Sequence, residues 1–331
     1  MNDVRFAKSF KKLVEVNGNV QPGETVVIVT DFSMTDIARQ LAVAVTAVDG
    51  IVSMCIMDQR TLDGQEPPKP IAAAMKEADV IYSPVQYSIT HTIAMKEALK
   101  NGARAILMTA HNEEVLLSPA LLKTDFQAQV PKCKALGEAF LKGNTVRLTS
   151  PKGTDLTFST KGRGVNVLTN IPNPGELAPV PDIEVNVVPV TGSANGKLVI
   201  DASVPYLGIG ILKEDIICIV KDGFITSMEG GEQAKFLKEK LDSYNDPNCF
   251  NVAELGVGMN PEARLTGNML DDEGIVGTIH IGIGTSLTLG GEIVAPIHYD
   301  LIMWEPTIEI DGVVVQRNKE QLFYKPEEST K

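Results

Sequence analysis

The chain is poor in cysteine and has no long apolar run. Its four cysteines among 331 residues are scattered, and no two of them have CxxC spacing, so neither a cysteine-based zinc site nor a disulfide framework is expected. Such cysteines are expected to stay reduced, which indicates a cytoplasmic protein. The chain lacks a run of about 18 apolar residues, the minimum for a membrane span, and its N-terminal segment lacks the apolar core of a signal peptide.

The chain also has fewer basic than acidic residues. Lys and Arg number 30 against 42 Asp and Glu, which gives a net charge of −12. Binding to nucleic acid or to anionic lipid needs a basic surface, so neither partner is expected. The first half has no GxGxxG or Walker motif and the chain has no GxSxG motif. Nothing therefore supports a nucleotide site or a serine nucleophile.

Two halves of the chain have different patterns, and its length is enough for two domains. In residues 1–144, apolar strand-like runs alternate with helix-like segments, from a strand at 25–30 to a helix at about 125–142. This pattern predicts a Rossmann-like α/β domain with a doubly wound, mainly parallel sheet. Residues 145–331 contain hairpins with tight turns, for example at 307–316, and predict an α+β domain with antiparallel strands.

Three apolar runs near the C-terminus, residues 252–259, 278–284 and 297–303, share one pattern. Alternate residues of a strand point to opposite faces, so each run has an apolar face and a face with Glu, His or Asp, which in the first two runs also carries glycines. These ionisable residues are Glu254, His280, His298 and Asp300. Two carboxylates and two imidazoles that face open space form a donor set for a divalent metal. The alternative is a structural network in which the carboxylates pair with Lys or Arg.

Three more ionisable residues are candidates. His91 lies near the start of a predicted helix, and His111 directly follows a predicted strand, where doubly wound sheets bind ligands. Each of them either binds substrate or is an ordinary loop histidine. Glu176 lies in a loop rich in Pro and Gly (residues 170–182), which the prolines make rigid. Its carboxylate is either directed into the pocket or is a solvated loop charge.

Four segments, NIPNPGE (170–176), AELGVGMNPEA (253–263), GTIH (277–280) and HYD (298–300), resemble the thermophilic aminopeptidases of the aminopeptidase T type. The resemblance spans most of the chain and is specific in the second half. It implies a pair of divalent metals on Glu176, Glu254, His280, His298 and Asp300. It further implies a metal-activated water that hydrolyses a peptide or amide bond of a small substrate. Glu176 and Glu254 would serve in catalysis, with Co, Zn or Mn as the metal.

Two features depart from the peptidases: Leu287 stands where they have a Tyr, and the chain is shorter. The first half, with segments 66–84 and 88–98, is similar to relatives that are 2,5-dihydroxypyridine 5,6-dioxygenases. Those use one Fe(II) on two His and one carboxylate to open a hydroxylated pyridine ring. His298 and Asp300 match two of these ligands, whereas Glu254 stands where the relatives have the third, a His.

The main expectation is therefore a metal-dependent hydrolase of a small molecule or short peptide, and the alternative is an iron dioxygenase. A third possibility is a non-catalytic relative that binds a small molecule. The resemblance also implies a homodimer, to which the hairpin at 307–316 could contribute an interface.

Overall fold

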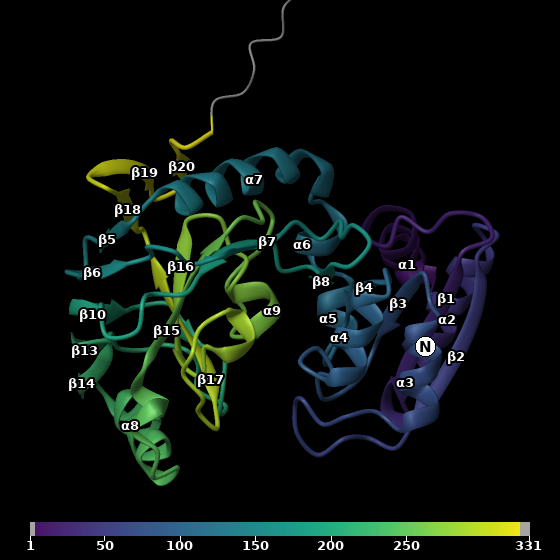
Figure 1. Cartoon of the computed structure of the whole chain (residues 1–331), viewed down its shortest axis with the longest axis horizontal. Coiled ribbons are helices and arrows are strands. Elements are labelled where there is room, and N and C mark those ends of the chain that lie inside the picture. Colours follow the sequence, from purple (N-terminus) through teal and green to yellow (C-terminus); the bar gives the residue numbers. More distant parts are fainter. Residues whose placement is uncertain (1–3, 325–331) are drawn as a thin grey trace, which may run out of the picture. The chain divides into compact units, whose positions relative to one another are not determined.

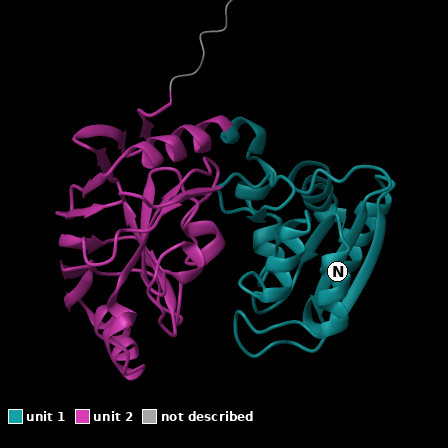
Figure 2. Ribbon diagram, in the orientation of Figure 1, with its two compact units in different colours: residues 1–130, 168–183 teal, residues 131–167, 184–331 magenta. Residues whose placement is uncertain are grey.

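The computed structural model describes residues 4–324, which form two compact units (Figures 1 and 2). Unit 1 contains the described residues of 1–130 and 168–183, and unit 2 those of 131–167 and 184–331. The chain thus does not divide at the predicted boundary after residue 144. Helix α7 (Phe126–Lys142) spans the first change of unit, and segment 168–183 returns to unit 1 because its strand β8 (Leu177–Pro179) pairs with β4 (Arg104–Leu107).

Unit 1 is an α/β unit with a parallel sheet of five strands, as the alternating pattern predicted. The order of the strands is β2 (Ile51–Met57), β1 (Thr25–Asp31), β3 (Val80–Ser83), β4 and β8. The longer helices are α2 (Thr35–Thr46), α3 (Lys69–Lys76) and α4 (Ile93–Lys100), and the shorter ones are α1 (Ala7–Lys12), α5 (Glu113–Leu116) and α6 (Pro119–Leu122). Val27 of β1 and Ile81 of β3 pack with Met75 of α3 and Met95 of α4 in one buried cluster, which is why apolar residues predominate in these strands.

Unit 2 contains two antiparallel sheets, again as predicted (Figure 1). The first has the order β14 (Phe224–Glu229), β13 (Ile216–Lys221), β10 (Asn195–Ile200), β6 (Asp155–Ser159), β5 (Thr145–Thr149), β18 (Thr307–Ile310), β19 (Val313–Arg317) and β20 (Glu320–Gln321). The second has the order β12 (Gly210–Ile211), β11 (Ser203–Val204), β17 (His298–Trp304), β16 (Thr278–Gly284), β15 (Val252–Gly258), β9 (Glu184–Val187) and β7 (Val165–Leu168). Helices α8 (Glu232–Ser243) and α9 (Met269–Asp272) complete the unit.

The hairpin at 307–316 is β18–β19, and each of its strands has another partner: β18 pairs with β5, and β19 pairs with β20.

None of the helices between residues 4 and 324 has the length and hydropathy of a membrane span.

The three predicted metal-binding runs are the central strands β15, β16 and β17 of the second sheet. Leu255, Ile281 and Leu301 are neighbours in register across them and are completely buried. Burial of such side chains stabilises each strand by about 1.5–3 kcal/mol per residue. This apolar face fixes the register, because a slip of one residue would bring the opposite face into the core. The opposite face is thereby held in place as well.

Candidate metal centre

Five ionisable side chains gather on one face of the second sheet of unit 2. Four adjacent strands supply them: Glu184 comes from β9, Glu254 from β15, His280 from β16, and His298 and Asp300 from β17. All are buried except His298, which is partly exposed. The four residues predicted from the alternating strands thus lie together, and Glu184 joins them.

Two glycines make room for the cluster. Gly256 is paired with His280, and a Cβ atom at Gly256 would overlap the imidazole ring. Gly282 lies between Glu254 and Asp300 in register. A Cβ atom there would be 2.8 Å from Glu254 Cβ and from His298 Nε2, closer than carbon contacts allow. These positions therefore need glycine for the space it leaves.

The donor atoms form two overlapping groups. In Glu254, His298 and Asp300, one ligand atom per residue lies within 4.8 Å of the others. Glu184, Glu254 and His280 form a second such group. The Nε2 atom of His298 is 2.9 Å from Glu254 Oε2 and 3.4 Å from Asp300 Oδ1, and His280 Nε2 is 3.1 Å from Glu184 Oε2. Glu254 belongs to both groups.

Neighbouring groups orient these donors. The Nδ1 atom of His298 donates to the carbonyl of Thr285 at 2.7 Å, which leaves Nε2 directed at the cluster. Asn186 donates to Glu184 Oε1 at 2.6 Å. The buried atoms Glu184 Oε2 and Asp300 Oδ1 face imidazole nitrogens: Glu184 Oε2 is 3.1 Å from His280 Nε2, and Asp300 Oδ1 is 3.4 Å from His298 Nε2. Such oriented oxygen and nitrogen donors fit a divalent cation.

The pKa shifts of the cluster residues also favour a bound cation. Burial lowers the pKa of His280, but the hydrogen bond and charge of Glu184, with the charges of Asp300 and Glu254, raise it to about 10. Burial likewise lowers the pKa of His298, and the adjacent Asp300 and Glu254 raise it well above its usual range. Burial raises the pKa of Glu254, an effect that His298 opposes. The carboxylates thus hold a proton on each imidazole, and a divalent cation would supply the same compensating charge.

Metal binding is accordingly expected to strengthen as the pH rises. Below about pH 10, a metal must displace a proton from His280 to bind its Nε2 atom, and protons compete less as their concentration falls. Each displaced proton should lower the apparent Kd about tenfold per pH unit. The Kd for Co²⁺, measured by competition with a chelator between about pH 6 and pH 8, tests this. A Kd that does not change with pH would contradict it.

Glu176 is not a member of either group. It is exposed, belongs to unit 1, and its carboxylate accepts hydrogen bonds from the backbone and side chain of Asn173 at 2.9 and 3.0 Å. The second glutamate that the structure places in the cluster is Glu184, and a role for Glu176 remains a prediction. The segment of Glu184, DIEVNV (182–187), alternates polar and apolar residues as the other three runs do, so the same strand rule could have identified it.

Neither of the other predicted histidines belongs to the cluster. His91 is exposed, whereas His111 is buried in unit 1 with Nδ1 3.4 Å from the carbonyl of Thr109. Burial lowers the pKa of His111 to about 4, so this ring is neutral at physiological pH. A role for either histidine in substrate binding remains a prediction.

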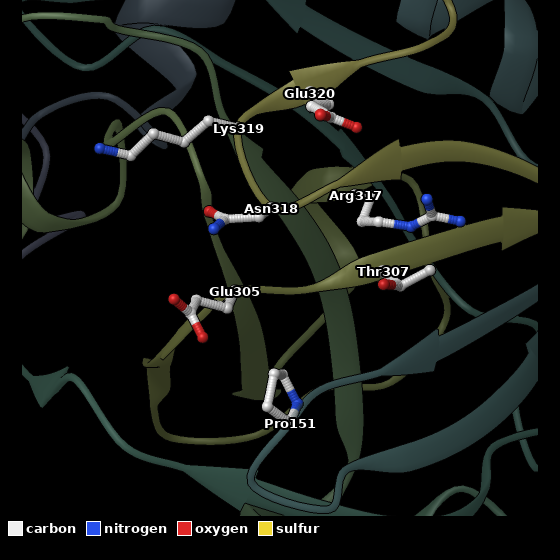
Figure 3. A pocket seen from close by; sticks show the side chains of 7 residues that line it. All are labelled: Pro151, Glu305, Thr307, Arg317, Asn318, Lys319 and Glu320. Atoms are coloured by element: carbon white, nitrogen blue, oxygen red, sulfur yellow. The ribbon is translucent and has the colours of Figure 1, made fainter.

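A cavity of about 540 Å³ in unit 2 is lined by other residues, including Glu305, Arg317 and Lys319. Figure 3 shows that the charged ends of Arg317 and Lys319 point in opposite directions. The lining of this cavity therefore offers no converging set of donors.

Comparison with known proteins identifies the family. Residues 5–320 match the family model of 2,5-dihydroxypyridine 5,6-dioxygenase. The chain belongs to this family. The 2,5-dihydroxypyridine 5,6-dioxygenase of Pseudomonas putida (strain KT2440) is 25% identical over 254 residues, which cover 73% of this chain and 70% of the relative.

Solved structures show the same fold. The structure of 2,5-dihydroxypyridine dioxygenase from Pseudomonas putida KT2440 has a TM-score of 0.83 and 19% identity, and covers 98% of both chains. AmpT from Thermus thermophilus has a TM-score of 0.67 and 15% identity, over 96% of this chain and 99% of AmpT. The resemblance to the aminopeptidases is thus confirmed as a relation of fold. Membership of the dioxygenase family supports an enzyme, and it favours the dioxygenase alternative over the expected hydrolase.

Proposed function

We propose that this protein is a metal-dependent dioxygenase that opens the ring of a hydroxylated pyridine, with Fe(II) held by Glu254, His298 and Asp300. The observation that carries the proposal is this group of donors within 4.8 Å, whose two carboxylates are buried, in a chain that matches the dioxygenase family almost throughout. Fe(II) would supply a redox-active centre with open positions for substrate and O₂.

The side chains around this group have distinct tasks. The carbonyl of Thr285 fixes the tautomer and orientation of His298. His280 belongs to the other donor group; its Nε2 atom lies 4.0 Å from both Glu254 Oε1 and Asp300 Oδ1, so it adds a second imidazole beside the proposed ligands. Burial of the carboxylates limits the access of water, which strengthens their interaction with a cation.

Oxygen consumption tests the proposal directly. Protein loaded with Fe(II) under anaerobic conditions is mixed with 2,5-dihydroxypyridine and oxygenated buffer in an oxygen electrode. We expect one O₂ consumed for each ring whose aromatic absorbance is lost, and no uptake by protein loaded with redox-inactive Zn²⁺. Absence of uptake by protein that demonstrably retains Fe(II) would refute the proposal for this substrate class.

A two-metal hydrolase is the second candidate, and one observation favours it: Glu254 belongs to both donor groups. A carboxylate shared between two cations about 3.5–4 Å apart is typical of dinuclear hydrolases. This candidate requires two metal ions per chain by elemental analysis, and cleavage of aminoacyl amides with Co²⁺, Zn²⁺ or Mn²⁺.

A further inference from the structure

Tyr206, which follows strand β11, contacts the cluster through its hydroxyl group. The phenol oxygen is 2.7 Å from Asp300 Oδ2 and 3.1 Å from Glu273 Oε1. Its ring packs against Tyr299 with centroids 4.9 Å apart, and the hydroxyl of Tyr299 is 3.0 Å from that of Tyr244. The packing of the Tyr206 ring against the Tyr299 ring therefore fixes the position of the Tyr206 hydroxyl.

This contact makes the two oxygens of Asp300 unequal. Oδ2 accepts the hydrogen bond of Tyr206, whereas Oδ1 is buried and faces the two imidazoles of the cluster. Oδ1 lies 3.4 Å from the Nε2 atom of His298 and 4.0 Å from that of His280. A phenol has one proton to donate, and the shorter contact assigns it to Asp300.

We propose that Tyr206 is a positioning residue that makes Asp300 bind the metal through Oδ1 alone. The inference rests on the metal centre proposed above. Coordination through both oxygens would make Oδ2 serve the metal and the phenol at once. A weakened contact with Oδ2 would leave the phenol only its longer contact, with Glu273 Oε1, and a weakened buried hydrogen bond is unfavourable. Coordination through one oxygen also leaves a position free for substrate or O₂.

Cobalt binding to two matched variants tests the role. Tyr206→Phe removes the hydroxyl that contacts Asp300, and Tyr299→Phe removes the other hydroxyl of the ring pair, which contacts Tyr244. We expect Tyr206→Phe to raise the Kd for Co²⁺ by about 10–100-fold and to change the intensity of the visible Co²⁺ absorption, which reports coordination number. Tyr299→Phe should leave both as in the wild type. Equal affinity and equal spectra for wild type and Tyr206→Phe would overturn the proposal.

A crystal structure of the zinc-loaded wild-type protein gives a second measurement that depends on no variant. We expect Asp300 Oδ1 at a bonding distance of about 2.0–2.2 Å from zinc, while Oδ2 still accepts the hydrogen bond of Tyr206. Coordination of zinc by both oxygens of Asp300 would overturn the proposal. Neither measurement uses a substrate. Failure of oxygen uptake by a metal-loaded protein would therefore refute the dioxygenase, whereas an unchanged Tyr206→Phe variant would refute only the role of Tyr206.

Discussion

Glu254→Gln is expected to remove the bound metal and to abolish turnover. Glu254 belongs to both donor groups and lies 2.9 Å from His298. The amide keeps the shape of the side chain but removes the negative charge that attracts a cation. We expect the Kd for the metal to rise by at least about 100-fold and turnover to fall by about 1,000-fold or more, since a lost ligand should exceed the 10–100-fold effect of an outer partner. Metal per chain after dialysis, and oxygen uptake, measure the two effects.

Glu176→Gln is the matched control, because it makes the same change at the glutamate that the aminopeptidase resemblance assigned to the metal. Glu176 is exposed and pairs with Asn173, so we expect metal content and turnover close to the wild type. Circular dichroism should show that both variants fold. Retention of metal by Glu254→Gln together with its loss from Glu176→Gln would show that the donor groups described above do not hold it.

The strand pattern predicted most of this site, because alternation is a local property of the sequence. Strands β15, β16 and β17 each bury an apolar face, so the sequence alone places Glu254, His280 and Asp300 on the face opposite the core. Glu184 obeys the same rule in β9. Its alternating run is short and directly follows a loop rich in Pro and Gly, so the run gives a weaker strand signal than the other three.

Other features depend on contacts between distant parts of the chain. Tyr206 lies in a loop after a strand of two residues, and it meets Asp300 94 positions later in the sequence, so no periodicity marks it. Strand β8 has three residues and joins the parallel sheet only through its pairing with β4, which is why the division of the chain differs from the predicted boundary. The types of the ligand residues also do not distinguish the two reactions, since hydrolases and iron dioxygenases both use His and carboxylate ligands.

Gly256→Ala is expected to disrupt the centre without changing any ligand. The added methyl group would overlap the ring of His280 at its Nε2 atom, and a shift of this ring would disturb the contact of Nε2 with Glu184 Oε2, now 3.1 Å distant. Overpacking of this kind costs about 1–3 kcal/mol of folding free energy, and displacement of a donor should weaken metal binding by about 10–100-fold.

The matched control for this substitution is Gly164→Ala, because an added Cβ atom at Gly164 meets no atom within 4 Å. Neither glycine has a positive φ, so the backbone allows both substitutions, and the space around the new methyl group distinguishes them. Thermal unfolding of the metal-free proteins and titration with Co²⁺ measure the two effects. We expect Gly164→Ala to match the wild type in both. If Gly256→Ala also matched it, the overlap with His280 would be relieved at no cost, and the glycine could not be what makes room for the ring.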